Sequence, residues 1–330
     1  DAALDLAERL PDDAEIVRWG ATVARASATV ERAHNERGER RVEMLLFAPL
    51  PGERRRPRRY LMDGAPKRAD EVVGEIVVVA FFPEDVELLA QAPSARRRYL
   101  DAMIAQVDRR HREETREYQR VLEQRNALLR ALRNEDRSRE DELAFWDGEL
   151  CRLAAAVSLR RIEAVRDLRE AFREASERFS GDRTTDMAYT TPASGETTPE
   201  RTVAYRRLLE EKREKELWQG ATLVGPHRED LAVTVAGRDL PSCASRGEQR
   251  STVLSLKLAE ASWLEARAGE LPVFLLDDVL SELDPERREK LIDALPSAAQ
   301  VLVTSALPAG LPRALAERAT VVPVSRGHVG

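Results

Sequence analysis

An apolar run that ends in two neighbouring acids is the feature that most constrains what this chain can fold into. The run covers residues 272–276, and the acids are Asp277 and Asp278. Two carboxylates are costly to bury inside a sheet, so they belong at the carboxyl end of a buried strand, where α/β proteins bind ligands. In phosphoryl-transfer sites the first such Asp holds Mg²⁺ and the next acid orients the attacking water. An acidic start to the following helix is the structural alternative.

The last third of the chain alternates strands with helices. We expect strands at 271–276 and 300–304 around a helix at 285–295, a pattern typical of a buried parallel sheet. Asp284, followed by Pro285, predicts the start of that helix, because Asp caps a helix N-terminus and Pro is tolerated in its first turn.

A second helix start lies upstream, where Ser245, Arg246, Gly247, Glu248 and Gln249 open an amphipathic segment. A Ser and a Gly at a helix N-terminus present a hydroxyl, bare N–H groups and the positive end of the dipole. These groups suit a phosphate, although the motif alone is a weak signal.

The first ninety residues predict mixed β-structure. Alternating residues at 22–31 and 40–48 surround a turn at 35–38, which indicates a hairpin, and further strands are expected at 60–62 and 76–79. Residues 1–10 resemble the middle of a helix without a capping sequence, so we expect more chain before Asp1.

The middle of the chain is helical. Apolar residues at helical spacing predict one long helix from Ser94 to about residue 132, a second over about 142–179, and a third at 199–218. A short strand is expected at 187–189. The stretch 108–120 carries one apolar residue, Tyr118, and is interpreted as a solvated face or, alternatively, a binding arm.

Together these segments resemble the ABC-type ATPase set of signature motif, Walker B strand and D-loop, and specifically the RecF family of bacterial DNA replication and repair proteins. Residues 222–231 and 275–284 resemble that family's hallmark and its Walker B and D-loop. The matching pieces run from about residue 16 to 305. Other family-like pieces are Phe82 to Asp85, Pro93 with Arg96, Arg97, Leu100 and Asp101, Gln124 to Asn126, and Trp146 with Asp147.

The resemblance implies an α/β fold: an ABC-type P-loop ATPase head with mixed and parallel sheet and an inserted helical lobe. Residues 1–93 and 219–330 would form the two parts of the head, and 94–218 the lobe. ATP would lie between two heads of a homodimer. Asp277 would then hold Mg²⁺ and Asp278 would orient the water, while Asp284 would lie at the dimer interface. The residues expected to meet the partner's nucleotide are Ser245, Arg246, Gly247 and Gln249; His227 and Arg228 would either contact nucleotide or brace the signature loop.

The sequence departs from the family pattern in three places. It contains no G-x-x-x-x-G-K-[ST] loop, which the family would place just before Asp1, so we expect a weak DNA-dependent ATPase in the full-length protein and an inactive chain without that loop. Glu248 stands where the family's signature usually has Gln. Residues 303–305 lie where many ABC ATPases have a switch His, and Gln91 is a weak candidate for the Q-loop residue.

DNA binding is implied chiefly by the resemblance. The net charge of −6 excludes a uniformly basic coat, so any DNA site must be regional. Two Arg clusters are candidates for backbone contacts, with solvated surface as the alternative. They are Arg54, Arg55, Arg56, Arg58 and Arg59 in a Pro-rich loop, and Arg96 and Arg97, followed by Arg98, at the start of the lobe.

The function implied is an ATP-dependent DNA clamp in recombinational repair and replication restart. It would help to load recombinase at gapped DNA with the mediator proteins RecO and RecR. An SMC-type chromosome-structural head, a transporter ATP-binding subunit and a non-hydrolysing interaction module are the alternatives. Cys151 and Cys243 have no metal-type spacing, which favours the cytoplasm, and no run approaches the roughly 20 apolar residues of a membrane span.

Overall fold

A computed structural model describes residues 16–31, 39–48, 57–133, 140–180, 184–306, 312–325 and 328–329, without the side chains at 86, 140, 180 and 282. The predicted helix at 1–10 and turn at 35–38 fall outside these ranges. Within them, no helix combines the length and apolar character needed to cross a bilayer.

A parallel sheet lies at the centre of the molecule. Its strands are β5 (Val78–Phe81), β9 (Val273–Asp277) and β10 (Val301–Thr304), in the order β10-β9-β5. Helix α10 (Pro285–Ala294) connects β9 to β10, as the alternating pattern predicts. Because the strands are parallel, their carboxyl ends share one edge, and Thr304 pairs with Asp277 there.

Two larger antiparallel sheets, and a short antiparallel pair of β11 (Val324–Ser325) with β12 (His328–Val329), accompany the parallel one in the described ranges. The first runs in the order β1 (Val23–Val30), β2 (Arg40–Phe47), β3 (Arg59–Met62) and β4 (Ala65–Lys67), so the predicted hairpin is confirmed. The second consists of β6 (Thr185–Thr190), β7 (Asp230–Val235) and β8 (Arg238–Asp239), and it contains the short strand expected at 187–189.

The main hydrophobic core lies between the parallel sheet and three helices. Helices α4 (Pro93–Ala105) and α9 (Arg246–Ala268) and the second half of α6 (Glu140–Ser180) contribute to it. The fully or nearly buried side chains at its centre include Phe81, Leu100, Met103, Leu168, Phe172, Val253, Leu254, Phe274 and Leu276. This core holds β9, and therefore its terminal acids, in a fixed place.

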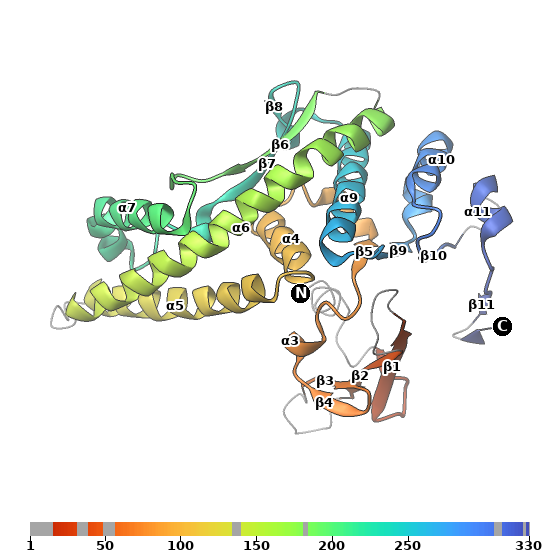
Figure 1. Cartoon of the computed structure of the whole chain (residues 1–330), viewed down its shortest axis with the longest axis horizontal. Coiled ribbons are helices and arrows are strands. Elements are labelled where there is room, and N and C mark those ends of the chain that lie inside the picture. The colour runs from red at the N-terminus through yellow and green to blue at the C-terminus, as the bar shows by residue number, and fades with distance from the viewer. Residues whose placement is uncertain are drawn as a thin grey trace.

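The helical lobe is built from α5 (Arg109–Arg133), the first half of α6 and α7 (Thr198–Gln219). Their facing sides bury Tyr118, Leu150, Leu153, Tyr205 and Leu209 in a second core. Figure 1 shows α6 as a long helix that runs from the lobe to α9, so one helix belongs to both cores. The sequence-based division at residue 94 places α4 in the lobe, whereas α4 packs in the main core.

The prediction of one long helix from Ser94 to residue 132 is wrong, because α4 ends at Ala105 and a separate helix, α5, begins at Arg109. The Gln106 side chain bonds both backbone groups of Val78, at 2.8 and 3.1 Å, and so fixes the end of α4 against β5. The Asp108 carboxylate then accepts the N–H of His111 at 2.9 Å and starts α5.

The interpretation of 108–120 as a solvated face is also wrong in part. His111 is fully buried and its Nε2 lies 3.0 Å from an Asp101 oxygen. Arg112 is buried as well and donates to the backbone oxygens of Val73 and Ala105. Polar side chains on this helix are thus part of the interior, because each finds a bonding partner there.

The remaining elements are short. They are α3 (Ala69–Val72), η1 (Pro83–Glu87), η3 (Pro226–Arg228), α8 (Leu240–Cys243), η4 (Val279–Glu282), α11 (Arg313–Arg318), β11 (Val324–Ser325) and β12 (His328–Val329).

Candidate functional site

The two acids lie where the sequence places them, at the carboxyl end of β9. Asp277 ends the strand with an exposed side chain, and Asp278 takes a left-handed conformation with φ of 48° and ψ of 18°. Asp tolerates this conformation better than most residues, although it still costs on the order of 1 kcal/mol. The turn η4 follows, held to the core by buried Val279 and Leu280.

Thr304 joins the two acids. Its hydroxyl donates to Asp277 Oδ1 at 2.5 Å and accepts the backbone N–H of Asp278 at 3.0 Å. The sequence pattern marks Thr304 only as part of residues 303–305, where many ABC ATPases have a switch His. The signal that it missed was register, since Thr304 ends the strand that pairs with β9 and is opposite Asp277.

The predicted signature segment forms a capped helix start. The Ser245 hydroxyl accepts the N–H of Glu248 at 3.3 Å, and the Glu248 carboxylate accepts the N–H of Ser245 at 2.7 Å. These bonds from Ser245, with a smaller contribution from nearby Arg287, lower the pKa of Glu248. A negative charge therefore lies at the helix start that is expected to meet a phosphate, which is the consequence of the Glu at this position.

Asp284 caps α10 as expected and brings a further residue to the site. Its carboxylate accepts the Arg287 N–H at 2.9 Å, which contributes most to the lowered pKa of Asp284, and bonds the Arg287 guanidinium at 2.5 Å. The same guanidinium lies 3.7 Å from where a Cβ on Gly247 would be. The starts of α9 and α10 are therefore adjacent, with Arg287 between them, and the sequence pattern gave no sign of this contact.

The described residues thus form two clusters. One is the acidic edge of Asp277, Asp278 and Thr304, and the other is the pair of helix starts with Ser245, Gly247, Asp284 and Arg287. Arg246 is exposed beside the second cluster, and the Gln249 amide donates to the Ala244 oxygen at 3.1 Å.

His227 is hydrogen-bonded through both of its ring nitrogens. Its Nε2 donates to the Thr222 oxygen at 3.1 Å, so Nδ1 accepts the Tyr118 hydroxyl, at 2.5 Å. Burial lowers the pKa of His227 to about 4, which keeps the ring neutral. Arg228 is exposed and also donates to the Thr222 oxygen, at 3.3 Å. These contacts join His227 to α5 and to residue 222 rather than to the signature loop at 245–250, so both alternatives for His227 stay predictions.

The segment around His227 ties the helical lobe to the sheets through buried charges. Arg125 is fully buried and donates to Asp147, Glu216 and Thr222 at 2.8, 2.6 and 2.8 Å. Buried Glu229 accepts the hydroxyls of Tyr189, Thr191 and Tyr205. The pieces at 124–126 and 146–147 that carry the resemblance are therefore parts of this joint.

Arg96 does not fit its predicted role as a DNA contact. Its side chain is buried, pairs with Asp230 through both Nε and Nη2 and donates to the Leu89 and Gln91 oxygens. Arg97 is half-buried, and its guanidinium donates to the Glu229 oxygen at 2.7 Å. Both guanidinium groups therefore bond to other residues of the protein.

The other basic cluster lies only partly within the described residues. Arg54, Arg55 and Arg56 lie outside the described residues. Arg58 is half-buried, and Arg59 is exposed with its guanidinium 5.6 Å from the centre of the Phe47 ring. Arg98, which follows Arg96 and Arg97 in α4, is exposed.

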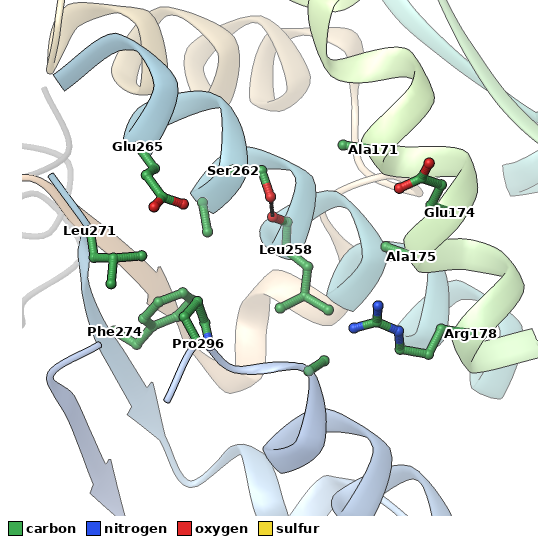
Figure 2. A pocket seen from close by; sticks show the side chains of 12 residues that line it. Ala171, Glu174, Ala175, Arg178, Leu258, Ser262, Glu265, Leu271, Phe274 and Pro296 are labelled. Carbon is green, nitrogen blue, oxygen red and sulfur yellow. Dashed lines mark hydrogen bonds between the residues drawn. The ribbon is translucent and has the colours of Figure 1, made fainter. Parts of the chain in front are cut away.

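A small cavity between α6, α9 and β9 is distinct from both clusters. Figure 2 shows Ala175 and Arg178 of α6, Leu258 of α9 and Phe274 of β9 around it. Its volume of about 110 Å³ is small beside the ~300 Å³ or more of typical ligand pockets. Its wall on β9 comes from the beginning of the strand, whereas the acids are at the end.

Comparison with known proteins places the chain in a family. No family model matches it. It is 39% identical over 312 residues to the DNA replication and repair protein RecF of Chloroflexus aurantiacus, a match that covers 86% of this chain and 76% of that protein. The chain belongs to the RecF family. The RecF of Roseiflexus castenholzii is 42% identical over 247 residues, and there the match covers 72% of this chain but only 63% of the relative.

Solved structures agree with this assignment. A structure described as the recombination mediator protein RecF-ATPrS in the RecFOR pathway has a TM-score of 0.80 and 27% identity, covering 92% of this chain and 80% of that one. The predicted RecF resemblance and the mixed α/β fold with a helical lobe are therefore confirmed.

Proposed function

We propose that this chain forms the head of an ATP-dependent DNA clamp that acts in DNA replication and recombinational repair. One observation carries the proposal: Asp277 and Asp278 lie on the carboxyl edge of a parallel sheet in a RecF-family chain. RecF structures described as RecF-ATPrS and RecF-ATP, with TM-scores of 0.80 and 0.78, support ATP as the nucleotide.

The acidic edge fits a magnesium site. Asp277 is exposed, and the Thr304 hydroxyl engages one of its two oxygens. The described ranges contain no group of three or more His, Cys, Asp or Glu side chains placed to hold a metal. Mg²⁺ is usually held by one or two carboxylates together with waters and substrate phosphates, and it neutralises charge on those phosphates.

Asp278 is the proposed residue for the attacking water. In hydrolysis the water oxygen bonds to the γ-phosphorus while the bond to the ADP oxygen breaks, and the water proton leaves through the Asp278 carboxylate to the phosphate product. One Asp278 oxygen is buried without a hydrogen-bond partner in the described part of the chain, so it is available as an acceptor.

The second cluster would face the other head of a homodimer. Ser245, Arg246, Gly247 and Gln249 would contact the partner's nucleotide, and Asp284 would lie in the interface. DNA would contact the loop containing Arg54 to Arg59 through its phosphates. The structural neighbour is described as a recombination mediator in the RecFOR pathway, which motivates RecO and RecR as the proposed partners. Recombinase loading at gaps is the proposed task.

Steady-state kinetics of the chain extended upstream to include a phosphate-binding loop would test the proposal. We expect slow Mg²⁺-dependent ATP hydrolysis, stimulated by DNA, and a loss of roughly 100-fold or more in kcat for Asp278→Asn with ATP binding retained. Asp293→Asn, the same change at an exposed residue of α10, is the matched control and should leave kcat unchanged. An Asp278→Asn variant with the parent kcat would remove Asp278 from the mechanism.

A further inference from the structure

We propose that Thr304 is a positioning residue for ATP hydrolysis, which holds the Asp277 carboxylate and the Asp278 backbone in their working orientation. The inference rests on the proposed function. Thr304 itself need not touch substrate, because it acts through the two acids.

The hydrogen-bond inventory of Thr304 leaves one arrangement for its proton. A threonine hydroxyl has a single donor and two acceptor lone pairs, and an ionised carboxylate only accepts. The Asp278 N–H occupies an acceptor position at 3.0 Å, so the proton points to Asp277 Oδ1 at 2.5 Å. The bond restrains rotation of the Asp277 carboxylate and leaves Oδ2 as the oxygen that would hold a cation.

The same hydroxyl supports the strained backbone at Asp278. This residue has φ of 48°, and both its backbone N–H and its carbonyl oxygen are hydrogen-bonded. Thr304 takes the N–H, while the carbonyl oxygen accepts the N–H and the hydroxyl of Ser281 at 3.1 and 2.8 Å. Backbone strain of this kind persists only where surrounding contacts enforce it. Without the Thr304 hydroxyl, Asp278 can relax and its carboxylate loses its direction.

Thr304 ends β10 opposite Asp277, and its position requires both strands to be in register. The Asp278 N–H lies one residue beyond the last pair of the β9–β10 ladder. A hydroxyl at the end of β10 therefore replaces the carbonyl that a longer strand would offer. Serine supplies the same group, whereas valine has the same shape without it.

The first experiment compares Thr304→Val with Thr304→Ser in the full-length protein. Loss of a residue that orients a metal ligand typically reduces metal affinity or activity by roughly 10–100-fold. We expect Thr304→Val to lower kcat within that range and to raise the Mg²⁺ concentration for half-maximal activity, with a smaller change in KM for ATP. Thr304→Ser should recover most of both, and Thr234→Val, on a strand of the second antiparallel sheet, should match the parent.

Parent-like kcat and Mg²⁺ dependence in Thr304→Val would overturn the inference while leaving the proposed function intact, provided that Asp278→Asn is impaired. Equal defects in Thr304→Val and Thr304→Ser would also contradict it, because the hydroxyl would then be irrelevant.

A second measurement does not depend on ATP hydrolysis. Hydrogen exchange of the Asp278 amide should be slow in the parent and in Thr304→Ser, and at least ~10-fold faster in Thr304→Val, because a bonded amide exchanges only on local opening. Equal exchange in all three proteins would refute the inference even if no ATPase activity is found. Absence of ATPase activity in the parent, in contrast, would refute the proposed function.

Discussion

Replacing Glu216 by Gln tests the buried ion pair that joins α7 to α5 within the helical lobe. Glu216 and Arg125 are both fully buried and their charged groups lie 2.6 Å apart. Burial alone would lower the pKa of Arg125, but the attraction of Glu216, followed by that of Asp147, raises it. Breaking such a buried pair from one side typically costs about 3–5 kcal/mol.

The expected loss in unfolding free energy for Glu216→Gln is about 3 kcal/mol. We place it at the lower end because Arg125 keeps Asp147 and Thr222, and because the Gln oxygen can still accept the Leu223 N–H, which lies 2.7 Å from Glu216 Oε1. Urea denaturation of the chain measures this loss.

Glu113→Gln provides the matched control. It removes the partner of Arg109 from an exposed pair in which both side chains are more than half accessible. Exposed pairs on helices contribute roughly 0.5 kcal/mol or less. A Glu216→Gln variant within 1 kcal/mol of Glu113→Gln would refute the view that this buried ion pair holds the helices of the lobe together.

Three other outcomes follow from the contacts and proposals above. The pKa of His227 is lowered to about 4 from an ordinary value of 6.5, so the stabilising contribution of neutral His227 is present above pH 6.5 and is lost as the pH falls toward 4. Between pH 7 and 5, the unfolding free energy of the parent should therefore fall by about 2 kcal/mol more than that of His227→Gln. Equal pH dependence of the two proteins in urea titrations would contradict the buried, neutral state of His227. Ser245→Arg should keep ATP binding by a single head yet abolish ATP-induced dimerisation in sedimentation, whereas loss of nucleotide binding itself would place the signature within one subunit. Replacing Arg54, Arg55 and Arg56 by Ala should weaken binding to unrelated duplexes equally and reduce the salt slope by roughly 0.9 per lost phosphate contact; an unchanged slope would make this loop ordinary surface.

Periodicity and local motifs predicted the parts of the fold that depend on near neighbours. The hairpin of β1 and β2, the alternation of β9, α10 and β10, and the caps at Ser245 and Asp284 all follow from residues a few positions apart. Alternation, turn residues and capping side chains act over such distances, so they are visible in one sequence.

The errors arose where distant residues decide the structure. The break between α4 and α5 depends on Gln106 reaching Val78, and Arg96 is buried because Asp230 lies beside it, 134 residues along the chain. Thr304 joined the candidate site through strand register, and Arg287 through contact between two helix starts. The residue type alone does not show whether a polar side chain is exposed or is buried with hydrogen-bond partners, so sequence patterns could not separate these cases.

Sedimentation velocity of the full-length Asp278→Asn protein tests the central claim most directly, that the acidic edge hydrolyses ATP between two heads. With ATP and Mg²⁺, this variant should remain a stable dimer, because nucleotide and metal still bind while hydrolysis is blocked; the parent should return to monomer as ATP is consumed. Asp278→Asn that stays monomeric with ATP, or that returns to monomer at the parent rate, would contradict the account.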